Sequence, residues 1–103
     1  EGPAAPSFRQ EGLASWYSDK LQGRPTASGA PYDRGALTAA HRTLPFGTVV
    51  RVLRRDADRS VVVTINDRGP FVEGRIVDLS RRAAEELAMI QAGVVPVRLE
   101  VVD

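Results

Sequence analysis

The candidate catalytic side chains of this chain lie close together in the sequence, between residues 36 and 80. This segment contains the single histidine, His41, and two aspartates, Asp67 and Asp78, that each end an apolar, β-branched run. Carboxyl groups and imidazole are the usual side chains of general acid–base chemistry. Strand ends often carry such groups, because the strands hold the geometry of the following loops fixed. We therefore interpret His41, Asp67 and Asp78 as candidate site residues.

Runs of β-branched residues predict the strands that position this segment. Residues 48–54 and 60–65 are the strongest strand predictions, and the polar residues 56–58 between them fit a hairpin loop. Residues 12–17 predict a first strand and residues 94–102 a last one, with Pro96 near its start favouring an edge or entry position. No other segment of the sequence contains a comparable run of β-branched residues that would predict a strand with the same strength.

A single helix is expected after the second aspartate. Ser80 is a suitable N-cap, residues 81 to about 90 form the body, and Gly93 follows the end. Ala83, Leu87 and Ile90 form one apolar stripe on it. Residues 19–37 are predicted to form a long loop. Short strands, one helix and long loops indicate a mainly β fold that closes into a small barrel.

Composition excludes several classes of function. A chain of 103 residues forms one domain, and 43% hydrophobic with 26% charged residues argues against wholesale disorder. The net charge of +1, with scattered arginines, gives no nucleic-acid interface. Without cysteine and with one histidine, the chain offers no structural zinc site, and we expect neither metal nor cofactor. No apolar run is long enough to span a bilayer.

The N-terminal segment differs from the rest in composition. Residues 1–10 are expected to be a flexible linker, because residues 1–7 are small, Pro-rich and without periodicity. They lack the pattern of a signal peptide, and the absence of an initial Met suggests a trimmed fragment of a longer protein. Residues 11–103 are the predicted domain.

Five ordered motifs resemble the rare lipoprotein A family, over a match from about residue 12 to the C-terminus. They are Ala-Ser-Trp-Tyr at 14–17, Thr-Ala-Ser-Gly at 26–29, Leu-Thr-Ala-Ala-His-Arg-Thr-Leu-Pro-Phe-Gly-Thr at 37–48, Val-Thr-Ile-Asn-Asp-Arg-Gly-Pro at 63–70 and Arg-Ile-Val-Asp-Leu-Ser at 75–80. The resemblance implies a six-stranded double-psi β-barrel with one short helix, as in expansins, barwin and one class of endoglucanases.

The resemblance also implies a function. Bacterial members of the family are lytic transglycosylases that cleave peptidoglycan glycan strands, preferably peptide-free ones, to 1,6-anhydro-muramyl ends. The expected partner is therefore the glycan strand, bound by a monomer in the bacterial cell envelope. The protein would be periplasmic or anchored to the outer membrane through a lipid that this fragment lacks.

The resemblance assigns roles within the motifs. Asp67 is the leading acid/base, His41 is expected to face it across the groove, and Asp78 matches a position on which expansins rely. Expansins place a hydroxyl residue where Ser15 stands. Further substrate contacts are expected from Tyr17, Arg68 and Trp16, and one of the two aromatic residues is expected to belong to the core instead.

Structural roles remain open for the same residues. Asp67 could organise a turn, and Asp78 could favour the nearby helix N-terminus, a reading that weighs equally with the catalytic one. A lone histidine such as His41 is often a surface or core residue. For Arg68, an internal ion pair with either aspartate is favoured over a sugar contact.

One position departs from the family pattern. Family transglycosylases usually carry Glu after Thr-Ala-Ser-Gly, whereas this chain has Ala30. That change favours an alternative function, a non-catalytic, expansin-like module that binds glycan or loosens the wall. A domain that only binds protein partners is a third possibility, without a mark in the sequence.

Overall fold

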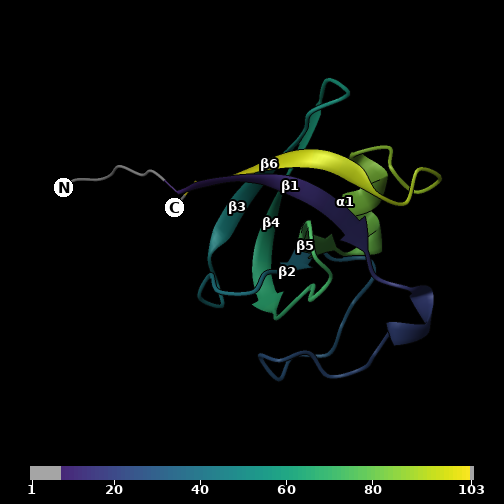
Figure 1. The fold of residues 1–103 in the computed structure, drawn as a ribbon. Helices are drawn as coiled ribbons and strands as arrows, with labels where there is room; N and C mark the ends of the chain where they lie inside the picture. The colour runs from purple at the N-terminus through teal and green to yellow at the C-terminus, as the bar shows by residue number, and fades with distance from the viewer. Residues whose placement is uncertain (1–7, 103) are drawn as a thin grey trace.

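A computed structural model describes residues 8–102, which form one closed barrel with strand order β1-β5-β2-β4-β3-β6 (Figure 1). The mainly β, six-stranded barrel with a short helix is thereby confirmed. The elements in chain order are β1 (Arg9–Trp16), the 3₁₀ helix η1 (Asp19–Leu21), β2 (Thr38–Ala40), β3 (Val49–Arg54), β4 (Arg59–Asp67), β5 (Arg75–Leu79), α1 (Arg81–Glu86) and β6 (Val95–Val101).

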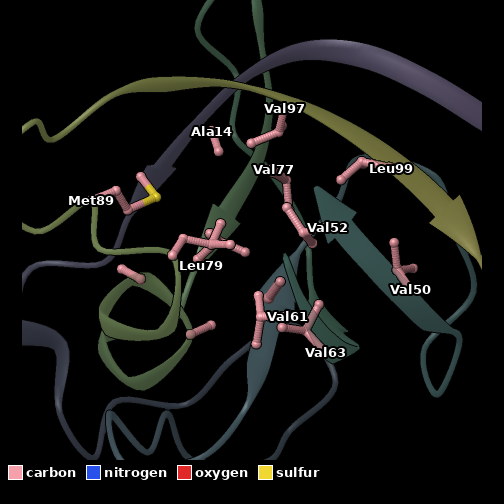
Figure 2. Close-up of a cluster of buried hydrophobic side chains, with 14 of the residues drawn as sticks. Ala14, Val50, Val52, Val61, Val63, Val77, Leu79, Met89, Val97 and Leu99 are labelled. Carbon is pink, nitrogen blue, oxygen red and sulfur yellow. The ribbon is translucent and has the colours of Figure 1, made fainter. Parts of the chain in front are cut away.

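Alternating side chains of the strands fill the barrel. In β6, Val95, Val97 and Leu99 are buried while the residues between them are partly exposed. They meet buried valines of β3 and β4 in the interior (Figure 2). Burying one such side chain stabilises the fold by about 1.5–3 kcal/mol. The helix α1 closes one side of this core with Ala83 and Ala84.

The first strand is longer than the sequence indicates. It begins at Arg9 rather than residue 12, because Arg9 to Ala14 pair antiparallel with β6. Residues 9 and 10, which we assigned to the linker, are therefore part of the barrel wall. Of the rest of the predicted linker, residue 8 is exposed and outside any strand, and residues 1–7 lie outside the described residues.

The helix is shorter than predicted. It ends at Glu86, and Leu87 forms its C-cap, instead of continuing to about residue 90. Ala88 then adopts a left-handed conformation with φ 55°, which a helix cannot continue through. This turn carries the chain around so that Met89 is fully buried and Ile90 packs against the core from outside the helix. The predicted apolar stripe thus reaches the core, but not as one helix.

The connections follow the sequence prediction closely. Residues 55–58 form the hairpin turn between β3 and β4. The segment from 19 to 37 is mainly loop, containing η1 and an isolated bridge between Pro25 and Pro31. It projects from the barrel beside the end of β4 (Figure 1). Among the described residues, no helix is both long enough and apolar enough to cross a membrane.

Candidate functional site

Four adjacent strands bring the candidate residues into one row. Ser15 on β1 lies opposite Asp78 on β5, and Asp78 lies opposite Ala40 on β2. Ala40 in turn lies opposite Asp67 on β4. The two aspartates are thus separated by one strand whose residue between them is a small, buried alanine. The structure therefore brings Asp67 and Asp78 together, although 10 residues separate them in the sequence.

Asp78 lies within strand β5, in a partly buried position. Its Oδ1 accepts a hydrogen bond from the hydroxyl of Ser15. Burial raises the pKa of Asp78 above its ordinary value, and the negative charge of Asp67 adds to this rise. The Ser15 hydrogen bond and the positive charge of Arg75 oppose the shift without reversing it. Asp78 therefore retains its proton to a higher pH than an ordinary aspartate does.

Asp67 is surrounded by donors instead. The hydroxyl of Tyr17 donates to its Oδ2, and the backbone amides of Ala27 and Arg68 each donate to its Oδ1 at 2.8 Å. Two of these three donors come from the segment after β1, so that the loop and the barrel wall meet at this carboxylate. Donors of this kind hold a carboxylate as an acceptor and fix its orientation.

Tyr17 connects the carboxylate to a pocket beneath the loop. Burial, followed by the hydrogen bond to Asp67, strongly raises the pKa of Tyr17, so its hydroxyl stays protonated as a donor. Its ring stacks on Tyr32 with centroids 4.5 Å apart and planes inclined by 12°. Both rings, together with Asp67, Arg24, Leu21 and other loop residues, line a pocket of about 190 Å³.

His41 lies next to this row but its ring points elsewhere. Nε2 lies 2.8 Å from Oε1 of Gln10, and Nδ1 accepts hydrogen bonds from the amides of Thr43 and Leu44, each at 3.1 Å. The residue is buried, with 3% exposure. Within residues 8–102 its link to Asp67 is a backbone hydrogen bond, from the His41 amide to the Asp67 carbonyl at 3.1 Å.

Burial also lowers the pKa of His41, and the charges of Arg68 and Arg42 lower it further. The neutral ring matches its contacts, since Nδ1 receives two amide protons and has no room for a third. His41 thus organises the connection between β2 and β3.

Arg68 and Arg42 brace two loops against each other. Arg68, in the β4–β5 connection, donates to the carbonyls of His41 at 3.2 Å and Leu44 at 2.8 Å. Arg42, in the β2–β3 connection, donates to the carbonyls of Pro70 at 2.6 Å, Val72 and Arg75. The internal ion pair favoured for Arg68 was wrong: among the described residues its partners are carbonyls and the face of the Phe46 ring, 4.1 Å from the guanidinium carbon.

Trp16 lies at the end of β1, between the core and the helix. Its ring packs against the core cluster, and the guanidinium of Arg81 lies 5.6 Å from the ring centroid. Tyr17, the next residue, faces the pocket beside Asp67. Of the two neighbouring aromatic residues, Trp16 therefore serves the core.

Comparison with known proteins agrees with the motifs. The family model described as lytic transglycolase matches residues 9–99. The chain belongs to this family. A relative named endolytic peptidoglycan transglycosylase RlpA, from Campylobacter jejuni, is 50% identical over 92 residues, covering 89% of this chain and 34% of the relative. A probable endolytic peptidoglycan transglycosylase RlpA from a Nostoc species is 58% identical over 93 residues, covering 88% and 25%.

The chain thus spans about a third or less of these relatives, and the resemblance to the rare lipoprotein A family is confirmed. Solved structures agree on the double-psi barrel of the lytic transglycolase family. The Streptomyces papain inhibitor superimposes with a TM-score of 0.74 at 25% identity, covering 93% of this chain and 96% of the inhibitor. The apo expansin of Clavibacter michiganensis superimposes with a TM-score of 0.71 at 25% identity, covering 93% and 51%.

Sequence reasoning missed three residues that shape the site in this family member. The Ala27 amide contacts Asp67, Tyr32 supports Tyr17, and Ala40 separates the two aspartates. Ala27 and Ala40 both lie within the motifs. However, alanine has no polar side chain, so nothing in its type indicated a role in the site.

Ala30, the position that departs from the lytic transglycolase pattern, belongs to the turn that contacts Asp67. Ala30 is exposed at the end of a turn in which its carbonyl accepts from the amide and the hydroxyl of Thr26, at 2.9 and 2.6 Å. The same turn presents the Ala27 amide to Asp67. A longer side chain at position 30 would therefore start from the rim of the site.

Proposed function

We propose that this domain cleaves the glycan strands of peptidoglycan as a lytic transglycosylase. The single observation that carries the proposal is the pair of carboxylates, Asp67 and Asp78, which lie on either side of the short strand β2 in different environments. The names of the relatives, at about half identity over most of this chain, supply the substrate class.

The two carboxylates divide the chemistry between them. Asp78 donates its proton to the glycosidic oxygen as the bond from that oxygen to the anomeric carbon breaks. The 6-hydroxyl of the same sugar then attacks the anomeric carbon, and its proton passes to Asp67. The products are a free hydroxyl end and a 1,6-anhydro end, and one proton has moved from Asp78 to Asp67. The raised pKa of Asp78 supports its assignment as donor.

The other predicted residues support this pair. Ser15 and Tyr17 hold the aspartates through their hydroxyls. We also propose that Tyr17 contacts the sugar, because it lines the pocket beside Asp67. For His41 and Arg68 we propose positioning roles, because their contacts fix the loops on either side of Asp67. This differs from the partner role expected for His41, which requires its ring to reach the carboxylate.

The test is replacement of Asp67 by Asn, followed by mass spectrometry of peptide-free glycan strands after incubation. Asp67→Asn keeps the side-chain size but cannot take a proton from the 6-hydroxyl. We expect a loss of anhydro ends by about 10²–10⁴-fold, the usual contribution of a general base. Glycan binding should persist. Asp58→Asn, at the exposed hairpin tip, makes the same chemical change away from the site and serves as the control.

Turnover of Asp67→Asn at the wild-type rate would end the assignment. A variant that no longer melts cooperatively would instead indicate that Asp67 organises the turn at residues 66–69. The two outcomes are separated by comparing melting curves with the anhydro yield.

A second function is favoured by one specific observation, the alanine at position 30. If the family's usual Glu is needed for turnover, the domain is a glycan-binding or wall-loosening module of the expansin type. Incubation of the unmodified chain then gives no anhydro ends, whereas Ala30→Glu restores them. Equal anhydro yields from both proteins would support the enzyme and discount the missing Glu.

We place this activity in the bacterial cell envelope, since that is where peptidoglycan lies. Within the envelope, the periplasm or an attachment to the outer membrane fits the proposal. The domain acts as a monomer on one glycan strand, because the row of site residues comes from a single chain.

A further inference from the structure

The pocket behind Asp67 contains a positive charge that the proposed chemistry does not use. The barrel contributes Asp67, Tyr17 follows β1, and the loop contributes Leu21, Arg24 and Tyr32. The two tyrosine rings and the leucine make much of the lining apolar. Arg24 is the cation among the residues that line it.

The guanidinium of Arg24 has no counterion in the part of the chain from residue 8 to 102. Nearby arginines are used differently: Arg81 and Arg34 both face Asp19, at 2.6 and 4.0 Å. Arg24 is exposed and forms no ion pair or side-chain hydrogen bond with any described residue. An unpaired arginine at a pocket can pair with a carboxylate through two parallel hydrogen bonds.

The backbone at Arg24 is held in place, so its side chain starts from a fixed point. Its amide donates to the Leu21 carbonyl at 2.9 Å, and its carbonyl accepts from the Tyr32 amide at 2.7 Å. The preceding Gly23 amide donates to the Tyr32 carbonyl at 2.8 Å. A side chain on such an anchored backbone loses less conformational freedom when a ligand binds.

Within residues 8–102, Asp67 lines the same pocket but forms no ion pair with Arg24. Its oxygens already accept from Tyr17, Ala27 and Arg68. These donors reduce the negative potential that Asp67 projects into the pocket. Arg24 is therefore the group in the pocket that can pair with a negatively charged group on the substrate.

We propose that Arg24 binds the free carboxylate of the lactyl group on a muramic acid residue of the glycan strand. This inference rests on the proposed function, which places a peptidoglycan strand at the site. The sugars of such a strand are neutral except for this carboxylate, which is charged only where no peptide is attached through an amide. The pocket volume of about 190 Å³ is large enough for the six heavy atoms of a lactyl group with its ether oxygen.

The consequence is a substrate preference set by charge. A strand with free lactyl carboxylates gains the arginine contact, whereas a strand whose carboxylates are amide-linked does not. Arg24 is then a specificity-determining residue next to the carboxylate pair.

The test measures binding by calorimetry with three ligands. They are a peptide-free muramyl strand, the same strand with its lactyl carboxylates converted to methylamides, and a chitooligosaccharide of equal length. The unmodified domain should bind the first about tenfold or more tighter than the second, as expected for a hydrogen bond to a charged group. Arg24→Gln should remove this difference while leaving chitooligosaccharide binding unchanged.

The matched control is Arg51→Gln, which makes the same charge change at an exposed position on β3 and should retain the full preference. The proposal is overturned if Arg24→Gln keeps the preference, if the unmodified domain has none, or if the variant weakens all three ligands equally. Failure of the cleavage proposal is distinguishable, because it appears as missing anhydro ends while the binding preference remains.

Discussion

The strand side and the loop side of the site give two aspartates different surroundings. Asp78 lies within the wall, where it contacts one hydroxyl, and burial raises its pKa. Asp67 lies at the end of β4, where a loop of the chain supplies two of its three donors. Both residues are aspartates, and only β2 lies between their strands. Their surroundings therefore differ in solvation and in the number of hydrogen-bond donors.

This difference shows how a small barrel can assign opposite roles to equal side chains. Burial favours the protonated form of Asp78, and the donors around Asp67 orient its carboxylate as an acceptor. The burial comes from the barrel and the donors come from the loop. Changes to either region should therefore affect one aspartate more than the other.

The largest effect is expected from Asp78→Asn. The variant should lose turnover by about 10²–10⁴-fold, because the proton donor is removed. It should also melt at an equal or higher temperature at pH 7. The folded state raises the pKa of Asp78 above 3.8, so the folded protein binds more protons and loses stability as pH rises through that raised value. Asn removes this loss.

Anhydro yield and thermal melting at pH 7 and pH 4 test the two parts. A lower melting temperature at pH 7 for Asp78→Asn would contradict the claim that the buried charge of Asp78 destabilises the fold. Unchanged turnover would leave Asp67 to act as both acid and base.

A smaller loss is expected from Tyr17→Phe, which removes one donor from Asp67 without changing Asp78 directly. Turnover should fall by about 10–100-fold if the lost hydrogen bond is worth about 1.5–3 kcal/mol. Tyr32→Phe is the control, since its hydroxyl accepts from the Arg81 amide at 3.1 Å and does not contact either aspartate. Equal losses in both variants would point to the stacked rings rather than to the hydroxyl.

Asp78 and the buried His41 should affect the pH dependence of stability in opposite directions. The folded state lowers the pKa of His41 below 6.5, so the unfolded chain takes up its proton first as pH falls. The stability contributed by neutral His41 is full above pH 6.5 and is lost as pH falls from 6.5 through the lowered value. Urea unfolding between pH 7.5 and 4.5 should show this decline, and His41→Gln should flatten it. A decline of equal steepness in His41→Gln would assign it to other groups.

The smallest effect is expected from Ser15→Ala. The Ser15 hydrogen bond lowers the pKa of Asp78, so its removal raises that pKa further. The limb of the pH–rate profile that depends on protonated Asp78 should move to higher pH, with little change in the maximal rate. A shift toward lower pH, or no shift, would show that the titration of Asp78 does not produce that limb of the pH–rate profile.

Much of the barrel was predictable because its long strands carry their own pattern. The β-branched residues 48–54 and 60–65 fall almost entirely within β3 and β4, and residues 94–102 contain β6. In contrast, β2 has three residues and two of them are alanine, so no local pattern separates it from a loop. The helix end was not predictable, since it lies at a left-handed turn at Ala88, an uncommon conformation for alanine, which precedes the buried Met89.

The sequence named the candidate residues, but the contacts between them became visible only in the structure. The motifs identified Asp67, Asp78, Ser15 and Tyr17, all of which meet in the structure. The sequence did not reveal that Ala40 separates the aspartates, because that depends on the register of three strands. The orientation of the His41 ring depends on Gln10, which lies 31 residues earlier, in the segment assigned to the linker.

The pairing of β1 with both β5 and β6 determines when this domain can fold. The first described strand, β1, hydrogen-bonds with two strands that come late in the domain, β5 and β6. Until those strands are present, β1 and β3 expose unpaired edges of the kind that promote association between chains. Contacts that are so distant in sequence also slow folding. The barrel can therefore close only after β6 is available, whereas the carboxylate pair needs only β2, β4 and β5.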